Sequence, residues 1–294
     1  MRFVANVFIT TLVIATFGCG ADNANNDQVA ATNPEEEKTS DSTKNEPGEE
    51  ENALDELRFR LDMLVANHAS APVALLMKLS KEEKDVFHPD YVNDVSRKET
   101  YNDNFSAALN FGVYKTDLIY DLVHHHLDDG LNARDAANHL ADHLWEEHIY
   151  SDDDVENYRM AQDNEEELES LLFQDYERTE KYLISHDQFE IATLTMVGSL
   201  VESMYFTSKA IEEHGISESK VNLLINEKHQ LHELVELLGF FKGNEKDATL
   251  MMKLEEVEHA YGKISGKKGL TEETVKHIDE AVFAVREDIV KNSI

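Results

Sequence analysis

The placement of proline constrains the fold of this chain more than any other feature. The 294-residue sequence has prolines at Pro34, Pro47, Pro72 and Pro89, and none after them. Proline removes a backbone donor and breaks helices, and strand-like alternation of apolar and polar residues is hard to find anywhere in the chain. We therefore expect an all-α body, a multi-helix bundle of about seven to nine helices with no sheet.

The expected helices follow from apolar side chains at helical spacing and from the turn residues between them. They cover residues 53–67, 72–80, 102–128, 132–149, 153–184, 188–213, 217–240, 246–262 and 271–291. A turn at Asp129-Gly130 is expected to separate the third helix from the fourth.

One expected helix is apolar on nearly every side. Residues 188–206 carry only two charges, Glu190 and Glu202, and their apolar side chains cover the whole circumference. Such a helix belongs at the centre of a bundle, so Glu202 should be buried and paired or protonated. A buried carboxylate of this kind can mark a site, in which Tyr205 would be a neighbour. The alternative is a structural Glu202 bound to a lysine, a tyrosine or backbone.

The N-terminus has the features of an exported, lipid-anchored protein. Residues 3–17 form an apolar run behind Arg2, as in a secretory signal. The end of the run, residues 16–19 (TFGC), resembles a bacterial lipobox, which implies a signal peptide over residues 1–18 and an acylated Cys19. Cys19 is the only cysteine, so it has no partner for an internal disulfide. The alternative is ordinary signal-peptidase cleavage after Ala21, which would remove the thiol.

The composition beyond Cys19 divides the mature chain into two parts. Residues 19–52 are rich in Asn, Asp, Glu, Thr and Ser, which predicts a disordered acidic tether, and residues 53–294 form the helical domain. The expected location is the outer membrane, facing the periplasm or the exterior, with the lipid anchor as the contact to the membrane. A net charge of −33 repels nucleic acid, so no such partner is expected.

A second largely apolar segment, residues 104–123, contains a recognisable motif. The string ALNFGVY at residues 108–114, followed by Asp117 and Leu118, resembles a motif of an uncharacterised family of Bacteroidetes lipoproteins. Weaker parallels, over residues 70–240, are the Ala-Pro-Val start at residues 71–73, the tyrosines at 91 and 101, and the small-residue, acidic and tyrosine pattern at residues 198–205, which here lacks a tryptophan. The resemblance implies a lipoprotein with an all-helical body and brings no assigned activity.

The same segment carries a polar strip between two apolar arcs. On a helical wheel the strip consists of Asn110, Tyr114, Asp117, Asp121, His124 and His125. Such a strip can line a ligand cleft, and its mixture of groups suits a small polar or glycan-like ligand. The ligand-binding candidates are therefore Asn110, Tyr114, Asp117, Glu202 and Tyr205, and the alternative is a strip that faces water. Gly112 would permit close approach of another helix.

Histidine clusters raise the question of a metal site. His139, His143 and Glu146 share one helix face at spacings that can chelate a metal ion, but they flank an apolar stripe and lack a zinc-protease or EF-hand pattern. A solvated helix flank is the interpretation we adopt, and no cofactor is expected.

No catalytic motif appears in the sequence. The favoured hypothesis is a lipid-anchored binding or interaction module of the cell envelope with an unknown ligand. Two alternatives remain open: a metal-dependent hydrolase or metal-binding envelope protein that uses His, Asp and Glu, and a structural protein that assembles through exposed helix faces.

Overall fold

The computed structural model describes residues 49–68, 71–82, 87–145, 150–241, 243–264 and 271–294, and these residues form helices and connecting turns without a strand. In chain order the elements are α1 (Glu49–His68), α2 (Ala71–Glu82), the 3₁₀ helix η1 (Val95–Thr100), α3 (Asn104–Val123), α4 (Leu127–Trp145), α5 (Asp152–Ala161), α6 (Glu165–Ser185), α7 (Phe189–His214), α8 (Glu218–Leu238), the 3₁₀ helix η2 (Gly239–Phe241), α9 (Glu245–Gly262) and α10 (Glu272–Val290). The all-α prediction is confirmed.

Three predicted boundaries were wrong. The helix expected over residues 153–184 is two helices, because Asn164 caps a new helix by accepting from the Glu167 backbone N–H. The turn expected at Asp129-Gly130 lies earlier, where His125 adopts a positive φ of 63°, and Gly130 sits inside α4 against Leu122. Finally, α1 begins at Glu49, inside the stretch that was predicted to be tether.

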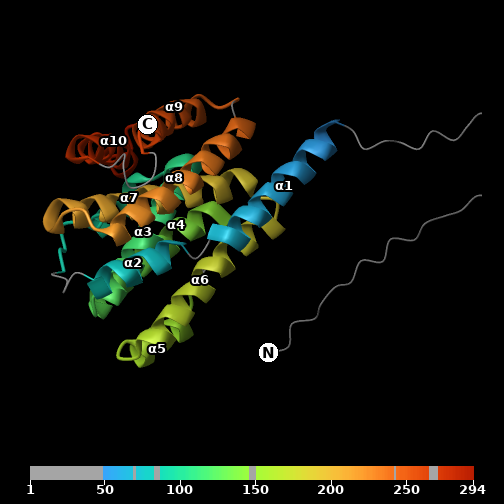
Figure 1. Ribbon diagram of the computed structural model, residues 1–294. Coiled ribbons are helices and arrows are strands. Elements are labelled where there is room, and N and C mark those ends of the chain that lie inside the picture. Colours follow the sequence, from blue (N-terminus) through green and yellow to red (C-terminus); the bar gives the residue numbers. More distant parts are fainter. Residues whose placement is uncertain (1–48, 69–70, 83–86, 146–149, 242, 265–270) are drawn as a thin grey trace, which may run out of the picture. The chain divides into compact units, whose positions relative to one another are not determined.

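Helices α3 and α7 form the centre of the bundle (Figure 1). Every residue of α3 from Phe105 to Val123 is buried, and α7 is buried almost continuously as far as Ser208, which confirms the prediction of a central helix. Helix α4 packs on α3, α8 and α10 pack on α7, and α9 packs on both α8 and α10. At the other side of the bundle α1 lies along α6, and α2 contacts α3, α6 and α7.

Two glycines bring α3 and α7 into backbone contact. A β-carbon on Gly112 would stand 2.1 Å from the Thr195 carbonyl oxygen, and one on Gly198 would stand 1.9 Å from the Leu109 carbonyl oxygen. The hydroxyl of Ser199 donates to the Gly112 carbonyl at 3.0 Å across the same contact. The close approach predicted for Gly112 is confirmed, and each helix contributes one glycine to it, Gly112 from α3 and Gly198 from α7.

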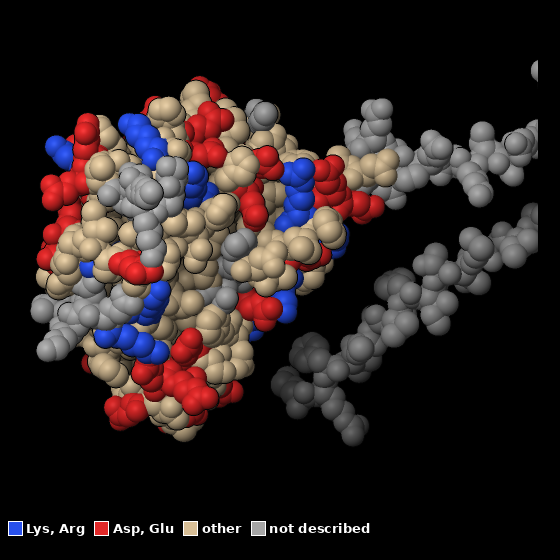
Figure 2. Space-filling view, in the orientation of Figure 1, with Lys and Arg blue, Asp and Glu red and all other residues tan. Residues whose placement is uncertain are grey.

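The surface is strongly acidic. Figure 2 shows Asp and Glu in several groups around a largely uncharged centre of the visible face, with Lys and Arg between them, and an acidic group around α5 and the start of α6. In the described part of the chain, no helix combines the length and the apolar character needed to cross a membrane.

Candidate ligand-binding site

The polar strip of α3 is largely buried. Asn110, Tyr114 and Asp117 are fully buried and Asp121 is 1% exposed, so the alternative of a strip facing water was wrong for these four. The strip meets water only at its end, where His124 is half-buried and His125 exposed.

Asn110 and Tyr114 hold neighbouring segments against α3. The Asn110 amide donates to the Ser106 carbonyl at 2.9 Å and to the Ile289 carbonyl of α10 at 3.1 Å. The Tyr114 hydroxyl donates to the Asp94 carbonyl at 2.9 Å. The polar groups of both side chains therefore form hydrogen bonds within the fold, and their role is structural.

Glu202 forms a buried ion pair with a residue that the sequence did not single out. Arg286 of α10 donates from Nε and Nη2 to the two carboxylate oxygens of Glu202 at 2.8 and 2.7 Å, and from Nη2 to the Tyr91 carbonyl at 2.7 Å. Tyr205 lies under the guanidinium, with 4.0 Å between the Arg286 Cζ atom and the ring centroid. Glu202 is fully buried, as predicted, and its partner is an arginine.

Beside this ion pair lies a cleft between the segment of residues 87–95 and the α3–α4 hairpin. We call it the acidic cleft, and its volume is about 430 Å³. It is lined by Phe87, Pro89, Asp90, Val92, Asn93, Asp94, Val95, Asp117, Asp121, Asp129, Asn132 and Ala133. That volume lies within the range of small-molecule sites.

Two carboxyl oxygens of residues that line the acidic cleft have no hydrogen-bond partner. Oδ2 of Asp117 accepts from the Asn93 backbone N–H at 3.0 Å, but Oδ1 of Asp117 and Oδ1 of Asp121 are buried and unpartnered. Buried polar groups are normally satisfied, because leaving one unsatisfied costs about 1–3 kcal/mol. Orphaned oxygens at a cleft wall therefore point to a group that is supplied from outside the chain.

Burial also makes both carboxyl groups hold protons tightly. Desolvation raises the pKa of Asp121 to about 8, and the nearby Asp129 carboxylate adds to the shift. Desolvation and the Glu202 carboxylate raise the pKa of Asp117 well above its usual range, and Arg286 only partly opposes this. The cleft wall can thus exchange protons near neutral pH.

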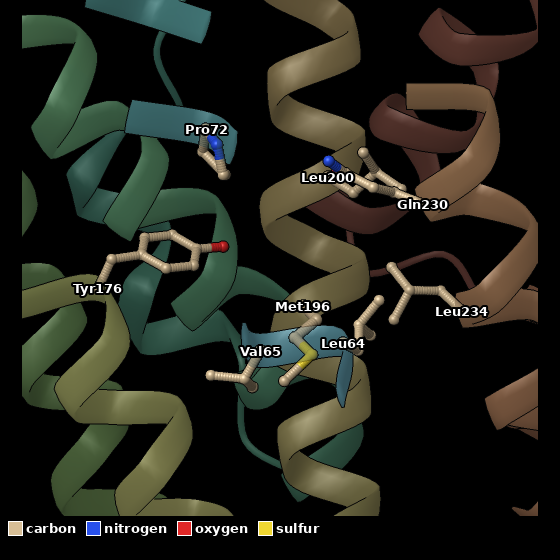
Figure 3. A pocket seen from close by; sticks show the side chains of 8 residues that line it. All are labelled: Leu64, Val65, Pro72, Tyr176, Met196, Leu200, Gln230 and Leu234. Carbon is tan, nitrogen blue, oxygen red and sulfur yellow. The ribbon is translucent and has the colours of Figure 1, made fainter. Parts of the chain in front are cut away.

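Three other hollows in the described part of the chain are not lined by a carboxyl group with an unpartnered buried oxygen. The apolar cavity in Figure 3, between Tyr176, Met196, Leu200 and neighbouring side chains, has a volume of about 30 Å³, which is room for a water molecule or two. A second cleft lined by Phe87 and His124–His126 holds about 590 Å³, and His124 and His125 each have a ring nitrogen hydrogen-bonded to a backbone carbonyl. A third, of about 640 Å³, lies at the starts of α3, α7 and α9.

The metal hypothesis gains no support from the geometry. Among the described residues, no group of three or more His, Cys, Asp or Glu side chains is arranged to hold a metal ion. His139 is 42% exposed and lies 3.6 Å from Glu99, and His143 is exposed. Glu146 lies outside the described residues, as do the predicted signal peptide, Cys19 and the tether up to residue 48.

The structure thus separates the predicted site residues into two groups. Asp117 lines the acidic cleft, whereas Asn110, Tyr114, Glu202 and Tyr205 lie in the hydrogen-bonded core behind it. Sequence reasoning placed Asp121 in the strip without naming it as a ligand residue. A carboxylate four residues after Asp117, on a helix that is otherwise largely apolar, was the pattern that could have identified it.

Comparisons with protein-family models, curated proteins and solved structures find no match to this chain.

Proposed function

We propose that this chain is a lipid-anchored binding module of the cell envelope, whose helical body binds a small ligand in the acidic cleft. The observation that carries the binding role is the pair of unpartnered, buried oxygens of Asp117 and Asp121 at the wall of a ligand-sized cleft. A site whose polar groups are satisfied only by a ligand gains hydrogen bonds on binding, and this favours a specific occupant.

The binding role is tested by a ligand screen on the purified body. Wild type and Asp121→Asn are compared by thermal shift against a panel of amines, sugars, short peptides, carboxylates and metal ions. We expect at least one class to stabilise wild type and to lose that effect in Asp121→Asn. If no compound produces a shift that depends on Asp121, the acidic cleft is not a binding site.

The anchoring role rests on the sequence of residues 1–19. An apolar run, a lipobox-like end and a lone Cys19 agree with the motif at residues 108–118, which resembles that of Bacteroidetes lipoproteins. Two or three acyl chains anchor a protein stably, whereas one chain is marginal. We place the protein at the outer membrane, facing the periplasm or the exterior.

Labelling with a palmitate analogue tests the anchor. Label should enter wild type and be absent from Cys19→Ala, and protease treatment of intact cells should then report which side the body faces. Equal labelling of both proteins, or a mature N-terminus at Asp22, would refute lipidation without affecting the cleft.

A further inference from the structure

Carboxyl groups outnumber cationic side chains around the acidic cleft. Three carboxyl groups, those of Asp117, Asp121 and Glu202, lie in or beside its wall, and the nearest buried cation is Arg286, which is committed to Glu202. No lysine, arginine or histidine lines the cleft among the described residues. Among the described lining residues, the only side chains with N–H donors are the amides of Asn93 and Asn132, and acidic side chains outnumber them, so a ligand that pairs with the ionised carboxyl groups should carry positive charge.

The stereochemistry of the two orphaned oxygens narrows the type of cation. They belong to separate side chains, Asp117 and Asp121, one helical turn apart, and the second oxygen of Asp117 is already bonded to Asn93. A guanidinium bonds best through two parallel N–H groups to both oxygens of one carboxylate, and a quaternary ammonium has no N–H donor. A primary ammonium has three diverging N–H donors, which suit two separate carboxyl groups.

The remaining lining indicates what the ammonium is attached to. Phe87, Val92, Val95 and Ala133 give the acidic cleft an apolar wall, which suits a hydrocarbon chain. The exposed carboxylates of Asp90 and Asp129 lie among the lining residues as well. A second ammonium at the far end of the chain would meet this additional negative charge.

We propose that the acidic cleft binds an aliphatic primary amine, with its ammonium between Asp117 and Asp121 and its carbon chain along the apolar wall. This inference rests on the proposed binding function and specifies its ligand class. Diamines bind more tightly than monoamines of equal length, because the additional carboxylates attract the second charge.

Binding of an amine also displaces protons. Asp121, with its pKa of about 8, is mostly protonated at pH 7, and an ammonium beside it favours the ionised form. The charged or titratable groups around the two carboxyls are Asp129 of α4, Asp90 and Asp94 of the 87–95 segment, Glu202 of α7 and Arg286 of α10. The amine should therefore bind more tightly as pH rises from 6 to 8.

The test is calorimetric titration with butylamine, putrescine and spermidine. Butanol, 1,4-butanediol and tetramethylammonium serve as probes that lack ammonium N–H donors, and guanidinium serves as a cation whose N–H donors have a different, planar geometry. Titrations of putrescine at pH 7 in phosphate and in Tris should give different heats, because a released proton is taken up by the buffer. We expect the three amines to bind. Asp117→Asn and Asp121→Asn should each weaken the affinity for putrescine by about tenfold or more, because each removes a charge-assisted hydrogen bond.

Asp247→Asn is the matched control. Asp247 is also a buried carboxyl group, and burial together with the neighbouring Glu190 raises its pKa to about 7, but it lies at the start of α9 and does not line the acidic cleft. It should leave amine binding unchanged. Should the diols or tetramethylammonium bind as well as the amines, or the three variants behave alike, the amine assignment is wrong. A different compound class that shifts wild type but not Asp121→Asn would overturn the amine while leaving the binding function intact.

Discussion

Arg286 donates two hydrogen bonds to the Glu202 carboxylate, and one of the same nitrogens also donates to the Tyr91 carbonyl. One largely buried guanidinium, 13% exposed, therefore joins α10, α7 and the segment that forms a wall of the acidic cleft.

Breaking this ion pair should destabilise the protein severely. Glu202→Ala leaves a buried guanidinium without its carboxylate, and we expect a loss of about 3–5 kcal/mol in the free energy of unfolding, measured by urea denaturation. The control is Lys276→Ala, which removes an exposed pair with Glu280 and should cost less than about 1 kcal/mol. Similar losses in the two variants would contradict the view that the Arg286 guanidinium needs the Glu202 carboxylate as its partner.

The contact between α3 and α7 should tolerate no side chain at its glycines. Gly198→Ala places a methyl group 1.9 Å from the Leu109 carbonyl oxygen, so the helices must separate. We expect a loss of about 3 kcal/mol or more in unfolding free energy, because the added methyl group meets backbone atoms of Leu109, which cannot rotate away as a side chain could. Gly262→Ala, whose β-carbon meets no atom within 4 Å at the end of α9, should be neutral or stabilising.

Lys115 and Glu180 provide a second test of buried charge. Their ammonium and carboxylate lie 2.8 Å apart and almost fully shielded, and burial lowers the pKa of Lys115 and raises that of Glu180. Lys115→Met alone should destabilise by about 3–5 kcal/mol, whereas the double change with Glu180→Leu should recover most of that loss. If the double variant is as unstable as the single one, shape rather than charge governs this contact.

Stability should fall as pH rises from about 4 to 8. Burial raises the pKa values of Asp121 to about 8, Glu227 and Asp247 to about 7, and Asp279 to about 6, whereas unfolded carboxyls ionise near 4. The folded state therefore binds more protons than the unfolded state across this window, so raising the pH favours unfolding.

Urea denaturation between pH 5 and pH 9 measures this slope. Asp121→Asn cannot ionise, so it should flatten the slope by up to about 1.4 kcal/mol per pH unit below pH 8. A slope identical to that of wild type would mean that Asp121 is ionised in the folded protein at neutral pH.

Helical spacing predicted much of this fold, because apolar periodicity and the all-round apolar character of residues 188–206 depend on local sequence alone. The close helix contact at Gly112 was also predictable, because a glycine within an apolar helix is visible in the local sequence. Arg286 could not be foreseen as the partner of Glu202, since their pairing depends on how α10 docks on α7. The acidic cleft was equally hidden, because one of its walls is the irregular segment around Asn93, whose path no periodicity describes.

The burial of α3 gives the two walls of the acidic cleft different dynamics. Backbone amides from Phe105 to Val123 are enclosed on all sides, so they should exchange hydrogen for deuterium only through global opening of the domain. The facing segment exposes Pro89 and Asp90 and is held mainly by individual hydrogen bonds from Arg286, Tyr114 and Asn93, so its local opening should be far faster. A ligand would therefore enter by displacing the 87–95 segment, whereas the rigid helix α3 would fix the positions of the carboxyl groups that the ligand's charges must match.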